Sequence, residues 1–209
     1  MKAIHKFMSE SFAKSAARFM NAVCYMMIAL SLAGLVLSFM GRQTFILYTP
    51  TATYDRAIYA EENHDWVSRG PTVSLKDDIR VTTDSKDGKV DLAMQIGLSA
   101  MYAITILPRV FAYWFLSRVF KNISEGQIFI EKNAAYLLYY GLIEIAVAAL
   151  VPFLKIAIGH IANQFSGNDM SAVTGQNILN DLLPNIAFII AAYIIHYGVH
   201  LQDEADHTL

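Results

Sequence analysis

Charge is distributed very unevenly along this chain, and one long segment has none. No Asp, Glu, Lys or Arg occurs in residues 19–40, and as a helix this segment covers about 33 Å, enough to cross a hydrocarbon core of about 30 Å. In contrast, 15 of the 34 charged residues lie in residues 43–91. Charged residues make up 16% of the chain, against about 25% in a soluble domain. The sequence therefore predicts an integral membrane protein.

Three further apolar segments, at residues 92–116, 134–161 and 182–200, complete a plan of four helices. The last of them follows Asn180 and Asp181, which are typical helix caps, and we expect Pro184 in its first turn. The fold class predicted is an all-α membrane protein with four transmembrane helices and a large extracytoplasmic loop. An even number of crossings places both termini on the same side.

The segments outside the predicted helices alternate between two sides of the membrane. The arm at residues 1–18, the loop 117–133 and the tail 201–209 share one side, and the loops 43–91 and 162–181 share the other. With Arg42, which directly precedes the large loop, counted on the second side, each side carries seven Lys and Arg residues, so the totals do not decide the orientation. The seven on the side of the arm are concentrated in short segments beside helix ends, which favours cytoplasmic termini.

The loop at residues 43–91 is long enough to contain a small sheet. Residues 79–83 and 89–92 flank a turn-rich segment ending in Gly88, a pattern typical of a β-hairpin. Residues 72–75 could add a third strand. A loop of about 50 residues holds a small sheet but not an independent core, so we expect it to rest on the helix ends.

Ionisable residues inside the predicted spans need partners, because each costs at least about 2.5 kcal/mol at membrane depth. Arg109 and Glu144 lie within about one helical turn of each other in predicted depth, so we expect them to form an intramembrane ion pair. A structural pair is favoured over a proton or ion relay, since a relay needs a chain of ionisable groups. Lys155 is expected to snorkel to the outer interface, with Asp181 as its partner.

Catalytic, cofactor and metal sites are not predicted. His196 and His200 share a helix face but lack a second ligand cluster, so we interpret them as interfacial groups and only as weak metal candidates. Phosphate loops, nucleophile elbows and zinc-protease motifs are missing from the sequence. A net charge of -2 argues against direct binding to nucleic acid. The single cysteine, Cys24, is interpreted as a buried apolar residue.

Two segments resemble a bacterial family of small four-helix membrane proteins of unknown function. They are Phe120-Lys-Asn-Ile-Ser-Glu-Gly-Gln-Ile-Phe129 with Glu131-Lys-Asn133, and Tyr197-Gly-Val-His-Leu-Gln-Asp-Glu-Ala-Asp-His-Thr-Leu209. His207 departs from the family, which has an apolar residue there. The resemblance implies a bacterial cell membrane as the location. Family members are often encoded beside a small Cro/CI-type helix-turn-helix regulator. The resemblance therefore also implies that this chain is the membrane partner of such a regulator. It implies no catalytic residues.

We therefore expect a non-enzymatic regulatory or sensory protein whose cytoplasmic surface binds the regulator. The acidic tail would compete with DNA phosphates for the basic residues of the regulator, Gly126 would supply a positive-φ turn, and Asn133 would cap the third helix. The predicted docking residues are Gly126, Phe129, Asn133, Asp203, Glu204 and Asp206. The alternatives are an immunity or envelope-stress-resistance protein acting through residues 43–91, and a small ion or proton transporter. Homodimerisation is a secondary alternative.

Overall fold

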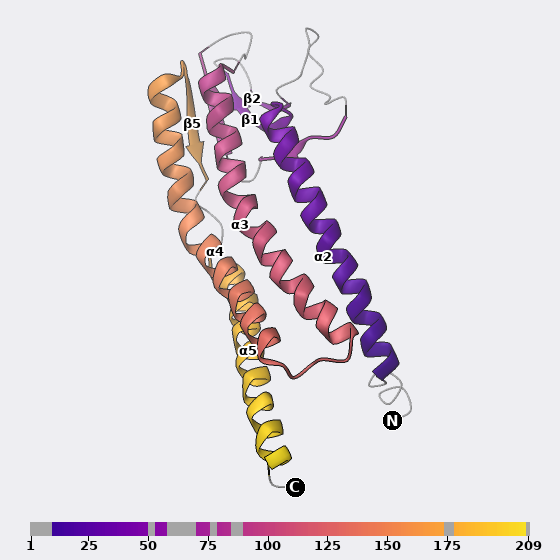
Figure 1. Cartoon of the computed structure of the whole chain (residues 1–209). Helices are drawn as coiled ribbons and strands as arrows, with labels where there is room; N and C mark the ends of the chain where they lie inside the picture. The colour runs from indigo at the N-terminus through magenta and orange to yellow at the C-terminus, as the bar shows by residue number, and fades with distance from the viewer. Residues whose placement is uncertain are drawn as a thin grey trace. The chain divides into compact units, whose positions relative to one another are not determined.

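The long apolar segments form helices, because an α-helix satisfies all of its backbone hydrogen bonds internally in lipid. The computed structural model (Figure 1) describes residues 10–49, 53–57, 70–75, 79–84, 90–173 and 178–207, leaving out the side chains of 10, 53–57, 178–181, 203 and 205–207. Within these residues four helices are long and apolar enough to cross a membrane, which indicates a multi-pass membrane protein. They are α2 (Glu10–Phe39), α3 (Leu92–Ser124), α4 (Glu131–Phe165) and α5 (Ile178–His207).

Each helix is longer than the apolar segment from which it was predicted. The apolar run of α3 ends at residue 116, yet the helix continues to Ser124 and spans 33 residues, about 50 Å. Charged residues such as Arg118 and Lys121 end a hydrophobic run, but Arg and Lys are good helix formers and do not end a helix. Because α5 already begins at Ile178, Pro184 lies inside the helix, and its expected place in the first turn is wrong.

The described strands form one mixed sheet. They are β1 (Gln43–Tyr48), β2 (Thr53–Ala57), β3 (Val73–Ser74), β4 (Ile79–Thr83) and β5 (Asn168–Ala172). The strand order is β2-β1-β4-β5, and β3 lies beside the start of β1. β1 pairs antiparallel with β2 and parallel with β3 and β4, whereas β4 pairs antiparallel with β5. The sheet thus joins the loop before α3 to the connection between α4 and α5.

The prediction of a second hairpin strand at residues 89–92 is wrong. β4 lies at the expected place, and β3 covers part of the expected strand at residues 72–75. However, Leu92 begins α3, and Val90 and Asp91 belong to no strand. Asp91 instead caps the helix: its Oδ1 accepts a hydrogen bond from the backbone N–H of Met94 at 2.8 Å, the usual N-cap bond. The partner of β4 on this edge is β5.

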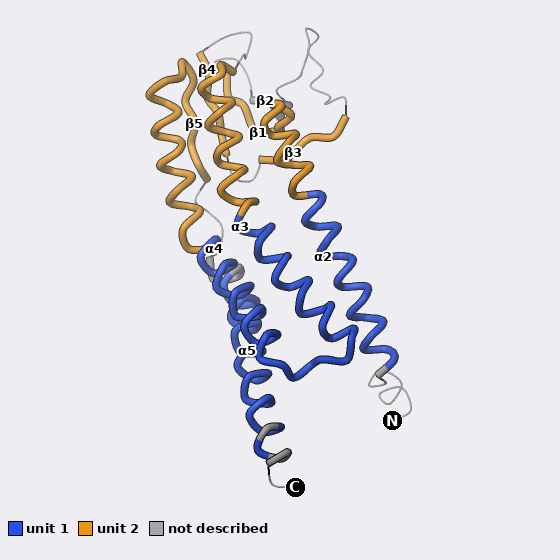
Figure 2. Tube along the Cα trace, in the orientation of Figure 1, with its two compact units in different colours: residues 1–30, 108–148, 178–209 blue, residues 31–107, 149–177 orange. Residues whose placement is uncertain are grey.

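Two units make up the chain (Figure 2). Unit 1 comprises residues 1–30, 108–148 and 178–209, and unit 2 comprises residues 31–107 and 149–177. In unit 2, alternate side chains of β1 and β4 are buried, as expected for strands with one covered face. They join α3, α4 and β5 in an apolar core of Phe45, Leu47, Leu75, Ile79, Val81, Met94, Leu98, Met101, Ala162 and Met170. The core of unit 1 contains Cys24, Leu116, Val119, Leu137 and Ala192.

A buried polar cluster connects three elements of unit 2. Gln43, the first residue of β1, is fully buried. Its side-chain nitrogen lies 3.0 Å from the carbonyl oxygen of Ser38 and 2.9 Å from the hydroxyl of Ser99. The Ser99 hydroxyl also donates to the Ser38 carbonyl at 2.9 Å. These bonds hold the end of α2, the start of β1 and α3 together inside an otherwise apolar region.

Side chains of unit 2 also hold β5 in place. Asn163 of α4 donates to the backbone carbonyl of Met170 at 3.0 Å and accepts from its N–H at 2.8 Å, so the amide pairs with β5 as a neighbouring strand would. Asp91 Oδ2 accepts hydrogen bonds from the Ser166 hydroxyl and the Gly167 N–H, both at 2.8 Å. The carboxylate that caps α3 therefore also binds the segment between α4 and β5.

These contacts change the acidity of Asp91. Burial raises the pKa of its carboxyl, but the hydrogen bonds outweigh burial and hold the pKa below its ordinary value; their donors are the backbone N–H groups of Met94, Gly167 and Ala93 and the Ser166 hydroxyl. A lowered folded-state pKa stabilises the fold above the unfolded-state pKa of about 3.9. The stabilisation is lost as the pH falls through the lower, folded-state value.

We predict that Asp91→Ala lowers the free energy of unfolding by about 1–2 kcal/mol at pH 7, because it removes a helix cap and the bonds to the next segment. The difference from the wild type should stay constant between pH 5 and 7 and shrink as the pH drops below about 4. Thermal unfolding in detergent measures both effects. Asp169→Ala, at an exposed position of β5, is the control. A stability difference between Asp91→Ala and the wild type that is equal at pH 7 and below about pH 4 would contradict the prediction.

Candidate functional site

A charged pair lies among the apolar helices of unit 1. Arg109 is on α3 and Glu144 is on α4, with 3.5 Å between Arg109 Nε and Glu144 Oε2. The Glu144 side chain is only 10% exposed, whereas that of Arg109 is 38% exposed. The structure thus brings together the two residues expected to pair. At 3.5 Å the contact is electrostatic more than a short hydrogen bond, and the low dielectric around Glu144 strengthens it.

Other ionisable side chains surround this pair. Tyr113 follows Arg109 by one turn on α3, Tyr140 precedes Glu144 by one turn on α4, and both tyrosines lie close to the pair and to Cys24 of α2. Tyr140 packs edge-on against Phe188 of α5, with 4.7 Å between ring centroids. Side chains from all four helices of unit 1 therefore meet here. At neutral pH tyrosine and cysteine side chains are ordinarily uncharged, so Arg109 and Glu144 are the charged members of this cluster, which favours a structural tie between helices over a relay.

Aromatic contacts hold α3 against α4 in the same unit. The ring of Phe115 on α3 lies 5.9 Å from that of Tyr136 and 5.2 Å from that of Tyr139, centroid to centroid. Arg118, past the apolar run of α3, places its guanidinium 5.0 Å from the Trp114 ring. Such a cation–π contact stabilises a charge near the end of a membrane helix.

The connection between α3 and α4 begins with a glycine turn, as expected. Gly126 has a φ of +87°, a conformation that residues with a Cβ rarely adopt. Its N–H donates to the Ile123 carbonyl at 3.0 Å, and the Gln127 N–H donates to the Asn122 carbonyl at 2.9 Å. These two bonds define a Schellman motif, which closes α3.

Asn133 does not cap α4, so that prediction is wrong. The helix begins two residues earlier, at Glu131, and the Asn133 side chain is fully buried. It donates to the loop carbonyls of Gln127 at 2.7 Å and Ile128 at 2.9 Å, and accepts from the Asn122 side chain at 2.8 Å. The amide binds loop carbonyls instead of helix N–H groups, and it fastens the loop to both flanking helices.

The same loop also contacts α5 in unit 1. A Cβ at Gly198 would lie 2.8 Å from Cδ1 of Phe129, so the glycine allows this ring to lie directly on the helix backbone. α5 continues past Gly198 to His207, so the acidic tail is helical where it is described. Glu204 is exposed, whereas the side chains of Asp203 and Asp206 lie outside the described residues.

Two further predicted pairs are Lys155 with Asp181 and His196 with His200. Lys155 on α4 is 9% exposed, and the side chain of its expected partner, Asp181, lies outside the described part of the chain, so that pairing stays a prediction. The rings of His196 and His200 stack edge-on with centroids 4.6 Å apart. Among the described residues, no group of three His, Cys, Asp or Glu side chains is placed to hold a metal ion.

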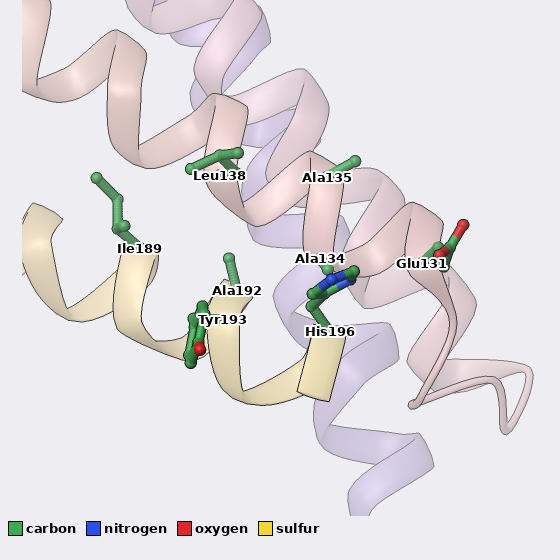
Figure 3. Close-up of a pocket in the computed structure, with 8 residues that line it drawn as sticks. All are labelled: Glu131, Ala134, Ala135, Leu138, Ile189, Ala192, Tyr193 and His196. Atoms are coloured by element: carbon green, nitrogen blue, oxygen red, sulfur yellow. The ribbon is translucent and has the colours of Figure 1, made fainter. Parts of the chain in front are cut away.

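A groove between α4 and α5 was not apparent from the sequence (Figure 3). It has a volume of about 440 Å³ and lies within unit 1. Three of its lining residues are alanines, whose short side chains leave space between the two helices. The lining residues are Glu131, Ala134, Ala135 and Leu138 of α4 and Ile189, Ala192, Tyr193 and His196 of α5. The alanines near the start of α4 were the feature of the sequence that pointed to this groove. They did not predict it, because alanines are equally common where helices pack closely.

A double-mutant cycle tests the tie between Arg109 and Glu144. We predict that Arg109→Met lowers the free energy of unfolding in detergent by about 2–3 kcal/mol, because a buried carboxylate loses its neighbouring cation. Arg109→Met combined with Glu144→Met should recover most of this loss, since it replaces the pair with apolar side chains. Lys121→Met, at an exposed position of the same helix, is the control. A double variant as unstable as the single one would rule out the tie.

Comparisons of the chain with models of protein families, with curated proteins and with solved structures find no match. The resemblance to the four-helix bacterial family therefore depends on the two segments at residues 120–133 and 197–209. Membership of that family stays a prediction. The arrangement of these two segments, with Phe129 lying on Gly198, is the geometric observation available for a functional proposal.

Proposed function

We propose that this chain is a regulatory membrane protein that holds a small cytosolic helix-turn-helix regulator at the membrane. The docking surface comprises the loop after α3, represented by Phe129, and the last turns of α5, represented by Glu204. No catalytic step is assigned to the chain. The observation that carries the proposal is the contact between Phe129 and Gly198, because it joins the two segments that resemble the bacterial family.

The loop offers a rigid apolar contact for a partner. Phe129 is 51% exposed and Ile128 is 41% exposed, although the loop around them is fastened by the buried Asn133. An exposed aromatic ring on a fixed backbone loses little conformational entropy on binding. This combination supports a protein contact at the loop.

The end of α5 offers negative charge. Asp203, Glu204 and Asp206 occupy the last two turns of the helix, where the helix dipole already places partial negative charge. Carboxylates are unfavourable at a helix C-terminus, so a cationic partner there relieves their repulsion. A DNA-binding regulator supplies such cations, and docking at this surface would compete with its binding to DNA phosphates.

A retention experiment tests the surface. The regulator for this test is a small helix-turn-helix protein encoded beside this chain. We predict that exchanging Asp203, Glu204 and Asp206 for Asn or Gln lowers its retention on membranes about tenfold. Three exposed ion pairs of about 0.5 kcal/mol each account for this factor. Phe129→Ala should lower it further. Regulator bound to vesicles containing each variant is measured by sedimentation at low and at physiological salt.

Two controls make this result specific. Asp84→Asn with Asp169→Asn removes exposed acids of unit 2 and should leave retention at the wild-type level. Phe153→Ala removes an exposed ring from α4 and should also have no effect. Equal retention by the wild type and the tail variant would refute docking at α5.

The proposal requires the loop after α3 to face the cytoplasm, which cysteine labelling tests. The chain has a single cysteine, Cys24, so a Cys24→Ala background is free of thiols. We predict that Asp84→Cys reacts with a membrane-impermeant maleimide in intact cells, whereas Glu125→Cys reacts only after the cells are opened. Both positions are exposed, so they should react equally once the cells are opened. The reverse pattern in intact cells would invert the orientation and exclude the docking proposal.

A further inference from the structure

We infer that the groove between α4 and α5 binds one membrane phospholipid with an ethanolamine headgroup. An acyl chain lies along the alanine-lined wall, and the headgroup ammonium lies at Glu131. The inference concerns a lipid site in unit 1 and does not depend on the proposed docking of a regulator.

The groove has the size and the lining of a ligand site. Its volume of about 440 Å³ is within the range of about 300–1,000 Å³ typical of small-molecule sites. Of its eight lining residues, Ala134, Ala135, Leu138, Ile189 and Ala192 are apolar. The stretch from Glu131 to Leu138 covers about 10 Å along α4, which suits the upper part of an acyl chain.

The charge-bearing side chain of the groove lies at one end, and Leu138 and Ile189 line the opposite end (Figure 3). Glu131 and His196 are at the polar end, and Tyr193 lies between the two ends. Glu131 is also the first residue of a helix long and apolar enough to cross a membrane, so the polar end belongs at the membrane interface. The groove therefore has the same polarity as a lipid, with a headgroup end and an apolar end.

The negative charge of Glu131 at the polar end of the groove favours a lipid headgroup that carries an ammonium. Glu131 is an exposed carboxylate, which attracts the ammonium of an ethanolamine headgroup and repels the anionic headgroup of phosphatidylglycerol.

The surroundings of the groove favour lipid over a protein as the occupant. Next to the groove, α5 exposes large apolar side chains: Ile190 is 55% exposed, Ile194 60% and Tyr197 59%. These residues lie on a helix that is long and apolar enough to cross a membrane. The medium in contact with such a surface is the acyl-chain region, which is a permanent source of ligand.

Native mass spectrometry of the full chain tests the site. The protein is released from detergent after incubation with phosphatidylethanolamine or phosphatidylglycerol that carry identical acyl chains. We expect about threefold more bound phosphatidylethanolamine, the effect of one exposed ion pair. Glu131→Gln should equalise the two lipids, whereas Glu125→Gln, at an exposed acid of the loop, should keep the wild-type ratio.

Groove-filling variants test the position of the acyl chain. Ala192→Val and Ala135→Ile each add methyl groups inside the groove, and we expect either to lower bound phosphatidylethanolamine about tenfold. Ala135 is less buried than Ala192, so the second variant remains informative if the first destabilises the helix packing. Ala187→Val, at an exposed position of α5, is the matched control and should bind as the wild type does.

Three results would overturn the assignment. Equal binding of the two lipids by the wild type would remove the headgroup preference. A preference that survives Glu131→Gln would place the headgroup elsewhere. A dimer of the chain that Ala192→Val and Ala135→Ile dissociate, with unchanged lipid binding, would show that a second copy occupies the groove.

Discussion

The need to pair every backbone N–H and C=O group without water governs this chain more than any other constraint. In hydrocarbon an unpaired peptide group costs several kcal/mol, so the apolar segments have to be helical along their whole length. Strands expose unpaired edges, and the described strands lie accordingly in the segments before α3 and after α4. Side chains then complete the pairing at the points where helices end. Asp91 serves the first turn of α3, and Gly126 closes its last turn.

Polar side chains in this protein connect segments more than they form sites. Asn133 binds two loop carbonyls, Asn163 binds both backbone groups of Met170, and Gln43 connects α2 to α3. Each supplies hydrogen-bond partners to polar groups of a neighbouring segment. The pair of Arg109 and the buried Glu144 has the same character, since it ties α3 to α4.

The sequence predicts the features that depend on composition along a single segment. Charge-poor runs identify the four helices, and depth along two of them is enough to predict the contact between Arg109 and Glu144. Features that depend on two distant segments are not predictable in this way. β5 has the sequence Asn-Asp-Met-Ser-Ala, which has little intrinsic preference for a strand, and it is held by Asn163 and by pairing with β4. The role of Asn133 was missed for the same reason, because it depends on carbonyls that the turn at Gly126 exposes.

The pairing of β4 with β5 has a consequence for biosynthesis. Ile79 pairs with Ala172, which lies 93 positions later in the chain, and both α3 and α4 are made in between. At a synthesis rate of about 5–20 residues per second, the open edge of β4 waits for roughly 5–20 s before β5 exists. During that interval it is an unpaired strand edge, the kind of surface on which aggregation begins. β5 therefore covers the edge of β4 only late in synthesis. Truncation of the chain before β5, or slow insertion of α4, would leave that edge unpaired.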